Sequence, residues 1–536
     1  MAAMVLAAGP VQGAVGACGA SGTTSIAAVT GLTGEAIAEA EPVVVEATVT
    51  ASFLGEDALD GFYLQGGTPP AGVFVYAPGF KPPAPPRHGE RWRLRARTGR
   101  YRGRVQLEAV EGTRFCGKAP VAPVALDATR RHRLSALADR LVRLKGPLTV
   151  ADVYNLGRYG SLGLAVGGRP FHPANGVDGG ARLGVLLDDG SYRRQPRPLP
   201  FVDENGVRRA GDRVGDITGI LTRAFGHWRI HPLDPPRFEP RNPRPEPPGP
   251  GDGLRVAQWN LRNYFVDLGG RGARTPGDLA RQRQRVRSVV RHINADALIL
   301  HEVQNDAAAV EDLLATINRG LEGRDRYRAA FRGGGESVIR TVILYRPDRL
   351  RVTKRRRAAQ PIHPRPPLWV RFDRHGGDEF AVLAAHFKSR GGCPERGDHD
   401  RGQGCWAQRR DAQTRALVRW LDGLYPEPGS MPPTLILADF NAYALETAMR
   451  TWRDAGFMDL IAARVPPQDR YTYNYRGESG YIDHALAGGG LSEQVQAVDI
   501  WHINADEPAY PYRRGAGIWR ASDHDPVIVE LRPPAE

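Results

Sequence analysis

A histidine and two aspartates stand together just before the last apolar run of the chain, in Arg520-Ala-Ser-Asp-His-Asp-Pro-Val527. A histidine beside a carboxylate can be held in one tautomer and made more basic, as a general base for water requires. His524 is therefore a candidate base. On its own, an Asp-His pair in a loop is more often a solvated turn than a catalytic site.

Five short apolar segments strengthen the catalytic interpretation, because each ends in or contains a polar residue of the same kind. They are Leu254–Asn260, Ala297–Glu302, Ala381–His386, Thr434–Asn441 and Gly480–Leu486. Such runs are typical of buried strands in a layered α/β domain, and strands of one sheet can converge on a single cleft. Each polar residue alone could be a strand cap, but together they favour one site. Its members would be Asn260, Glu302, His386, Asp439, Asn441, Asp483 and His524.

Phosphodiester hydrolysis is a reaction that such a set could catalyse. It needs a metal ion to neutralise charge, an activated water and a donor for the leaving oxygen. A lone carboxylate with amide and water ligands suits Mg²⁺, and Glu302 is the first choice for that ligand, with Asn260 beside it. We expect Mg²⁺, with Mn²⁺ as its substitute and Ca²⁺ as a further candidate. The sequence has no His/Cys cluster with zinc spacing, which argues against a zinc hydrolase.

Further motifs follow one another through about the last half of the chain. They are Asn260-Leu-Arg-Asn-Tyr-Phe265, Arg281-Gln-Arg283, Ile343–Pro347, His386–Ser389, Gly402–Trp406, Asp439–Tyr443, Gly480–Ala485, Trp501–Glu507 and Ser522–Pro526. In this order they resemble the endonuclease/exonuclease/phosphatase superfamily, the deoxyribonuclease I-like group. The closer likeness is to bacterial extracellular nucleases that carry an OB-like region before the catalytic domain.

The resemblance implies a role for each site residue. Asp439 and Asn441 would position water and phosphate, and His524, paired with Asp523, would be the base. His386, oriented by Asp483, would donate to the leaving group or stabilise the phosphorane. The expected metal ligands are Asn260, Glu302 and Asp523, and the expected phosphate contacts are Arg365, Lys388 and Tyr473, each of which could equally be an ordinary surface or packing residue.

Several neighbouring residues have a second interpretation or depart from the family pattern. His484 is expected to be a packed core histidine, because it alternates with Asp483 on its strand. His502, Asp506 and Glu507 could form an accessory ion site, although a solvated loop is the favoured interpretation. Two departures from relatives are His301-Glu302-Val-Gln304-Asn305, where a second acid is lost, and Ser337, where an acid is replaced and Glu336 is the nearest substitute.

The composition sets wider limits. A chain of 536 residues is too long for one hydrophobic core and predicts about two to four domains. The 73 Lys and Arg against 59 Asp and Glu give a formal charge of +14, which favours polyanions, with nucleic acid ahead of anionic membrane surfaces. A coding bias toward Arg, Gly, Ala and Pro could explain part of this excess.

The N-terminus and the four cysteines bear on the compartment. Residues 1–20 are a candidate secretory signal, although they lack a basic n-region; a lipobox around Cys18 is a weaker alternative. The local arrangement favours the pairings Cys18–Cys116 and Cys393–Cys405, and the alternative is four free thiols in a cytosolic protein. No stretch of eighteen apolar residues is present, so we expect a secreted or periplasmic protein without a transmembrane segment.

The remaining sequence predicts four further parts. Residues 21–118 carry short alternating strands and predict an OB-like β-barrel, and residues 119–234 predict a second β-rich OB-like domain. Residues 235–253 form a proline-rich linker, and residues 254–536 form a four-layered α/β sandwich. Trp92, among arginines, could stack on a nucleic-acid strand or equally face the barrel core.

These observations predict a monomeric, metal-dependent phosphodiester hydrolase that cleaves extracellular DNA, with RNA as a further candidate substrate and with the barrels aiding nucleic-acid binding. Two alternatives stay open. One is a superfamily phosphatase or phosphodiesterase acting on small phosphoesters. The other is a catalytically silent nucleic-acid-binding protein, against which the complete set of candidate site residues argues.

Overall fold

The computed structural model describes residues 15–55, 57–80, 84–130, 132, 134–249, 251–333, 337–375, 379–509 and 517–533. The chain divides into two compact units. The first takes Met1–Arg169, Gly180–Asn242 and Pro508–Tyr512, and the second takes Pro170–Gly179, Pro243–Glu507 and Arg513–Glu536. None of the described helices is long and apolar enough to span a membrane.

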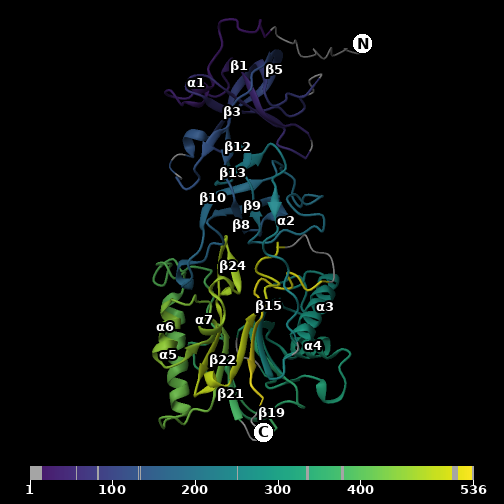
Figure 1. Cartoon of the computed structure of the whole chain (residues 1–536), viewed down its shortest axis with the longest axis vertical. Helices are drawn as coiled ribbons and strands as arrows, with labels where there is room; N and C mark the ends of the chain where they lie inside the picture. Colours follow the sequence, from purple (N-terminus) through teal and green to yellow (C-terminus); the bar gives the residue numbers. More distant parts are fainter. Residues whose placement is uncertain are drawn as a thin grey trace, which may run out of the picture. The chain divides into compact units, whose positions relative to one another are not determined.

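A closed barrel of five strands, in the order β1-β2-β3-β5-β4, opens the first unit (Figure 1). Its elements are α1 (Ile26–Thr30), β1 (Pro42–Phe53), β2 (Gly61–Gly66), β3 (Ala71–Tyr76), β4 (Glu90–Tyr101) and β5 (Arg104–Lys118). Alternate residues of β1, such as Val43, Val45 and Ala47, point into the core, as the pleat of a strand requires. Trp92 is 8% exposed and belongs to the same core. Its expected role as an exposed stacking platform is therefore wrong, and its core position is confirmed.

A nine-stranded sheet, in the order β14-β11-β8-β9-β10-β13-β12-β7-β6, completes the first unit. Its elements are β6 (Val124–Leu126), β7 (Arg140–Leu144), β8 (Leu148–Asp152), α2 (Leu156–Tyr159), β9 (Ser161–Val166), β10 (Ala181–Asp188), β11 (Arg213–Val214), β12 (Ile217–Ala224), β13 (His227–Pro232) and β14 (Phe238–Glu239). The pairs β6–β7 and β10–β13 are parallel. The sequence predicted a second small barrel here, because a run of short strands does not reveal parallel pairing between distant strands.

Two disulfides join Cys18 to Cys116 and Cys393 to Cys405, as the sequence predicted. The first holds the segment before α1 against β5, where Arg93 Nε also donates to the carbonyl of Val15 at 2.8 Å. Because the sulfur of Cys18 is already bonded, it cannot carry a lipid, so the lipobox alternative is wrong. Residues 1–14 of the candidate signal lie outside the described residues. Two disulfides indicate an oxidising compartment.

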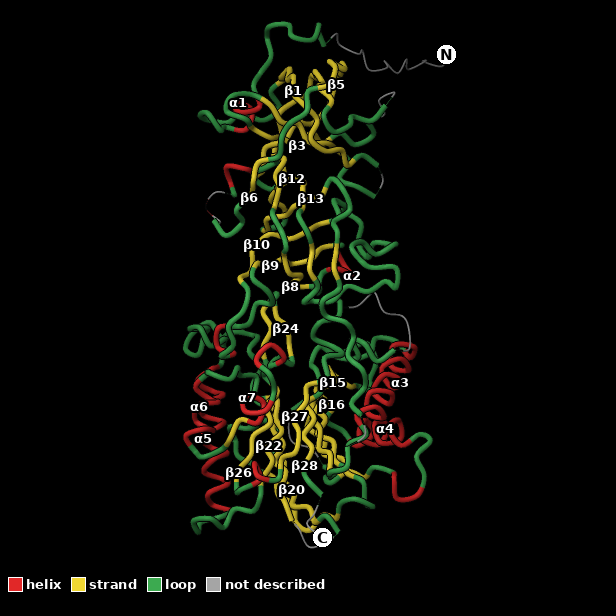
Figure 2. Tube along the Cα trace, in the orientation of Figure 1, coloured by secondary structure: helices red, strands yellow, loops and turns green. Residues whose placement is uncertain are grey.

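Two six-stranded sheets, packed face to face, form the centre of the second unit (Figure 2). The first, in the order β17-β18-β16-β15-β28-β27, contains β15 (Leu254–Tyr264), β16 (Ala297–Gln304), β17 (Arg328–Ala329), β18 (Ile339–Tyr345), β27 (Val495–Ile500) and β28 (Val527–Leu531). The second, in the order β19-β20-β21-β22-β26-β23, contains β19 (Arg351–Arg357), β20 (Leu368–Asp373), β21 (Glu379–His386), β22 (Thr434–Asp439), β23 (Met458–Asp459) and β26 (Asp483–Gly488). Ile299 and Val529 of the first sheet share one core with Val382 and Leu437 of the second.

Helices cover the outer faces of both sheets, which gives four layers (Figure 1). They are α3 (Pro276–Ile293) and α4 (Ala307–Asn318) on the first sheet, α5 (Ala407–Leu424) and α6 (Thr447–Asp454) on the second, and the short α7 (Leu460–Arg464), whose apolar residues join the central core. Thr275 and Asp278 form a capping box at the start of α3, as that motif predicts. The expected α/β sandwich is therefore present.

Candidate active site

Register brings three of the predicted residues into a row at the edge of the second sheet. His386, Asp439 and Asp483 are the facing residues of β21, β22 and β26. In the first sheet, Asn260 of β15 faces His301 of β16. Since the two sheets pack face to face, strand ends from both contribute to one buried site. The expectation that strand ends converge is therefore confirmed for these residues.

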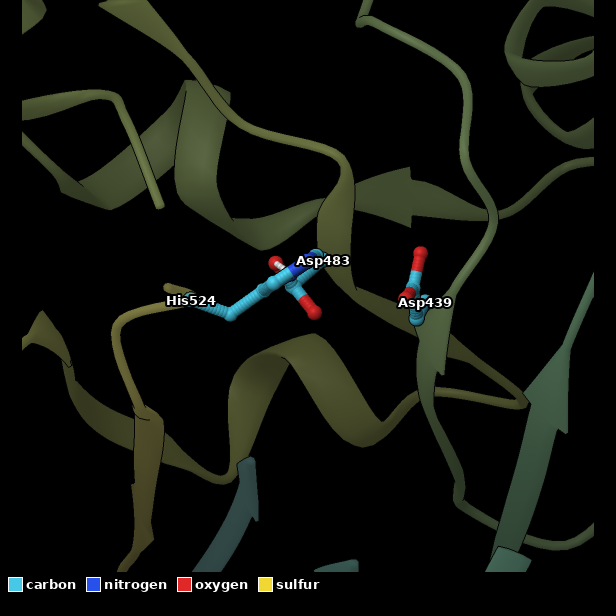
Figure 3. A group of neighbouring side chains, drawn as sticks. All are labelled: Asp439, Asp483 and His524. Carbon is cyan, nitrogen blue, oxygen red and sulfur yellow. Dashed lines mark hydrogen bonds and ion pairs between the residues drawn. The ribbon is translucent and has the colours of Figure 1, made fainter. Parts of the chain in front are cut away.

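His524 is held by Asp483, which is the partner that the sequence did not predict (Figure 3). Its Nδ1 lies 2.8 Å from Asp483 Oδ2, and Thr472 Oγ1 donates to the same oxygen at 2.6 Å. A carboxylate only accepts, so Nδ1 carries a proton and Nε2 remains for chemistry. Burial lowers the pKa of His524, but the charge and hydrogen bond of Asp483 outweigh it, so the pKa stands well above its usual range.

Asp439 lies beside this pair and receives hydrogen bonds from two amides. Asn260 Nδ2 donates to Oδ2 at 3.0 Å, and the backbone N–H of Asn441 donates to Oδ1 at 3.0 Å. Burial, and then the charge of Asp483, raise the pKa of Asp439 to about 7. His386 Nε2 lies 3.5 Å from Asp439 Oδ2. The predicted orientation of His386 by Asp483 is therefore wrong.

A cation would fit this cluster. Asp439, Asp483 and His524 each offer a ligand atom, and these atoms all lie within 4.8 Å of one another. Two nearly fully buried carboxylates repel each other when both are ionised, and a cation between them would offset that cost. Asp483 Oδ1 also has no hydrogen-bond partner among the described residues. The oxygen-rich donor set suits a hard ion such as Mg²⁺.

Glu302 borders the cluster from a distorted part of β16. The pairing of β16 with β15 and with β18 shifts register around this residue, and its φ is 61°. Asn441, with φ 53°, has the same left-handed backbone. This conformation costs free energy in a residue other than glycine, and such strain is concentrated at functional sites. The charge of Glu302 makes a small contribution to the raised pKa of Asp439.

Residues 257–524, half of the chain, match the Endonuclease/Exonuclease/phosphatase family. The chain belongs to this family. The matched residues lie mostly in the second unit, and the resemblance to this superfamily, predicted from the motifs, is confirmed. No curated protein matches the chain.

Solved structures similar to the chain include an endonuclease/exonuclease/phosphatase from Bacteroides vulgatus, with 16% identity and a TM-score of 0.37 over 53% of this chain and 100% of that one. The human Nocturnin catalytic domain with bound sulfate has 14% identity and a TM-score of 0.36, over 52% and 93%. D. rerio TDP2 complexed with single-strand DNA product has 13% identity and a TM-score of 0.35, over 52% and 98%.

Asp523 lies at the rim of the family site rather than on His524. Its Oδ2 is 3.6 Å from Arg262 Nε, and it accepts a hydrogen bond from Ser522 Oγ at 3.4 Å. Burial raises the pKa of Asp523, but the positive charges of His524, Arg262 and Arg520 lower it further, so the net shift is downward. The sequence predicted the pair Asp523–His524 from adjacency, and the backbone turn sends the two side chains to different partners.

The three expected phosphate contacts have different surroundings. Arg365 donates through Nε to the carbonyl of His386 at 2.9 Å and also bonds the carbonyl of Phe387, so it supports the end of β21. Lys388 is held over the ring of Trp406, at 4.9 Å from its centroid, beside the Cys393–Cys405 loop. The Tyr473 ring lies 4.8 Å from the ring of His524 and borders the site.

The loop with Asp506 and Glu507 was expected to be solvated, but the structure buries it. Asp506 and Glu507 have 0% exposure. Tyr471 donates to Asp506 at 2.7 Å, and Arg244 forms two hydrogen bonds with Glu507, at 2.9 and 3.1 Å. His502 lies 3.1 Å from Asp525. The sequence missed this network because its cationic and aromatic partners are far away in the chain.

His484 and the departures from the family pattern complete the comparison with the sequence. His484 bonds the carbonyl of Ala442 at 2.8 Å and packs on Phe440, so the predicted core histidine is confirmed. His301 is fully buried, bonds Thr341 Oγ1 at 3.0 Å, and its ring lies 5.6 Å from that of His386. Glu336 lies outside the described residues.

A segment that lies far from the other site residues in sequence also supports the site, and this role was not predicted. Residues 170–179 belong to the second unit. The side chain of Asn175 donates to the carbonyl of Arg470 at 2.9 Å and accepts from the N–H of Tyr481 at 2.9 Å, and His172 stacks on Tyr443 with centroids 3.9 Å apart. These contacts fix the chain on both sides of Thr472 and close to Asp483.

The proline-rich linker is also packed rather than free. Phe238 and Glu239 form β14 in the first unit, and in the second unit Trp501 Nε1 donates to the carbonyl of Glu246 at 2.9 Å. Proline limits regular secondary structure but does not prevent such contacts, which is why composition alone predicted a spacer.

Proposed function

We propose that this protein is a metal-dependent nuclease that hydrolyses DNA, and also RNA, in an oxidising compartment. The observation that carries the proposal is the buried cluster of Asp439, Asp483 and His524, with Asn260 bonded to it. The formal charge of +14 favours a polyanionic substrate,. The closed five-stranded barrel, which we propose to be OB-like, would assist binding,.

His524 is proposed as the base that takes a proton from water. Asp483 holds Nδ1–H and stabilises the imidazolium, which raises the pKa of His524. Nε2 accepts the proton of water only in the neutral form of the ring, whose share increases with pH. The Thr472 hydroxyl and the backbone carbonyl of His524, which accepts from Trp259 Nε1 at 3.0 Å, fix the position of both partners. A base fixed from both sides loses little entropy when it reacts.

Asn260 and Glu302 are the proposed ligands of Mg²⁺, together with Asp439 of the buried cluster, to which Asn260 is bonded. Asp523 is a further candidate at the rim. The bound ion would neutralise phosphate charge and support the developing negative charge. Asn260 also fixes the rotamer of Asp439 by its hydrogen bond. Asp439 and Asn441 are then placed to orient water and phosphate.

His386 is proposed to stabilise the phosphorane by a hydrogen bond. Burial, aided by the charge of Arg365, lowers the pKa of His386 well below its usual range, so the ring is neutral near pH 7. A neutral imidazole donates a hydrogen bond but is a poor source of a full proton. His386 Nδ1 is buried and has no hydrogen-bond partner among the described residues.

Digestion assays test this function. Supercoiled plasmid, 5′-labelled single strands and labelled RNA are incubated with the purified protein in EDTA and then with Mg²⁺, Mn²⁺, Ca²⁺ or Zn²⁺, and p-nitrophenyl phosphate esters are assayed in parallel. We expect nucleic-acid cleavage that is absent in EDTA and restored by Mg²⁺ or Mn²⁺. Hydrolysis of the small esters alone would establish the phosphatase alternative, and no hydrolysis with any ion would establish the silent one.

A further inference from the structure

An open cavity in the first unit is lined by aromatic rings and arginines. It has a volume of about 380 Å³ and lies between β9, β10, the β12–β13 turn and the loop after β10, a size within the ~300–1,000 Å³ of ligand sites. Tyr192, Phe225 and Arg194 line it, and the two rings are 49% and 50% exposed. Large apolar rings gathered at an exposed cavity mark interaction sites more often than scattered ones do.

Phe225 is held at the cavity by an unfavourable turn. It connects β12 to β13 together with Gly226, and the two residues have φ of 53° and 80°. A two-residue hairpin with both φ values positive favours Asn-Gly or Gly-Gly, and a bulky side chain in that conformation is a strained outlier. Neither burial nor turn geometry explains a phenylalanine here, so its exposed ring indicates a function.

Cations are stacked on Phe225 and on the neighbouring ring of Tyr101. The guanidinium of Arg102, from the β4–β5 turn, lies 4.9 Å from the centroid of Phe225 and 5.4 Å from that of Tyr101. Arg229 lies 5.4 Å from the Phe225 centroid on β13. Tyr101, like Tyr192, is about half exposed. Two hairpin tips thus present alternating rings and guanidinium groups.

Charge selects the class of ligand. Arg193, Arg194 and Arg229 line the cavity, and none of the residues that line it within the described part of the chain is acidic. Asp57 pairs with Arg193 and Asp188 with Arg229 from outside the lining, whereas Arg194 is exposed. Stacking rings beside cations are the features by which proteins bind single-stranded nucleic acid.

We propose that this cavity binds single-stranded nucleic acid, with bases stacked on Tyr192 and Phe225 and phosphates held by Arg194 and its arginine neighbours. This proposal rests on the proposed nuclease function. It also assigns substrate binding to a surface other than Trp92, which lies in the barrel core. It gives the first unit a specific surface for the substrate.

Binding is measured by fluorescence anisotropy of a 5′-fluorescein (dT)12 strand with the full-length protein in EDTA, and a gel checks that the strand stays intact. The variants are Phe225→Gly, Tyr192→Ala and Arg194→Ala, and Phe115→Ala is the matched control, because Phe115 is 52% exposed outside the cavity. Phe225→Gly suits the turn better than phenylalanine does, so thermal stability should be kept or raised while binding falls.

We expect Kd to rise about 10-fold for each lost ring, in line with alanine scans of stacked bases. Arg194→Ala should reduce the log–log salt slope by about 0.7, and Phe115→Ala should change neither quantity. Equal Kd values for wild type and the two ring variants would overturn the inference, as would an abasic strand that binds as tightly as (dT)12.

The nuclease proposal fails separately. If binding depends on the rings but no metal-dependent cleavage occurs, the cavity proposal stands and the catalytic role of the second unit is rejected. If the protein cleaves nucleic acid but the ring variants bind (dT)12 as wild type does, the nuclease proposal stands and the cavity proposal is rejected.

Discussion

In the second unit, Asp439, Asp483 and His524 lie buried within 4.8 Å of one another, whereas in the first unit Tyr192 and Phe225 stand about half exposed around an open cavity. The buried groups are oriented by hydrogen bonds from neighbouring strands, as electrostatic catalysis requires. The exposed groups can meet a flexible strand of any sequence, as stacking recognition requires. The contrast suggests that chemistry and strand recognition have been assigned to different units.

The largest expected effect is a loss of turnover, and it tests the catalytic role of the second unit. His524→Ala and Asp483→Asn should each lower turnover by roughly 10²–10⁴-fold, because each removes the positioned base or its support. Turnover is measured with saturating Mg²⁺, and thermal unfolding is checked in parallel. Arg415→Ala, which breaks a surface ion pair on α5, is the control and should leave turnover unchanged. Near-normal turnover in His524→Ala would show that another group is the base.

The second prediction concerns Asn175. This residue belongs to the second unit, but the residues before and after its segment belong to the first unit. Asn175→Ala leaves the Arg470 carbonyl and the Tyr481 N–H unsatisfied in a buried place, which costs about 1–3 kcal/mol of unfolding free energy. We expect a lower urea midpoint and lower kcat with an unchanged Kd for (dT)12. Asn175→Asp keeps the acceptor and should lose less. If stability falls but kcat does not, the segment is merely structural.

The third effect that we expect is a pH dependence of stability confined to the second unit. His363 is buried against Phe387, and within the described residues neither ring nitrogen has a partner. Burial lowers the pKa of His363 to about 4, from 6.5. Its contribution to stability is therefore present above pH 6.5 and is lost as the pH falls toward 4, by up to about 1.4 kcal/mol per pH unit.

Replacement of this histidine, in His363→Leu, should remove that loss. Urea unfolding at pH 5 and pH 7.5 measures it, with the slope against pH rather than the absolute stability as the readout. Identical slopes for wild type and variant would show that His363 does not titrate as its burial implies.

Much of the second unit could be predicted from the sequence. Segments such as Thr434–Asn441 predict a buried strand and the polar residues that end it. Both the layered fold and the residues that form the site could therefore be predicted from local pattern. Partners could not be predicted in the same way. Asp523 is adjacent to His524 in sequence, but Asp483 reaches it across strands. Side-chain direction in a turn depends on backbone angles that sequence adjacency does not specify.

The first unit could be predicted less well, for a related reason. The strand pattern indicated the barrel, and the disulfide to Cys116 followed from cysteine placement. The stacking of Arg102 on Phe225 at the cavity depends on two hairpin tips that meet only after folding. The direction of the Trp92 ring could not be predicted, because an aromatic residue among arginines has the same local sequence whether its ring faces the core or the solvent.

The most direct test of the central claim is single-turnover cleavage of a labelled DNA duplex, measured against Mg²⁺ concentration for wild type and Glu302→Gln. For wild type, we expect no cleavage in EDTA and a saturable rise with Mg²⁺. In Glu302→Gln, the midpoint should move to higher Mg²⁺, with much of the lost rate recovered there, because one ligand has lost its charge. Wild-type cleavage that persists in excess EDTA, or equal midpoints for the two proteins, would contradict the account.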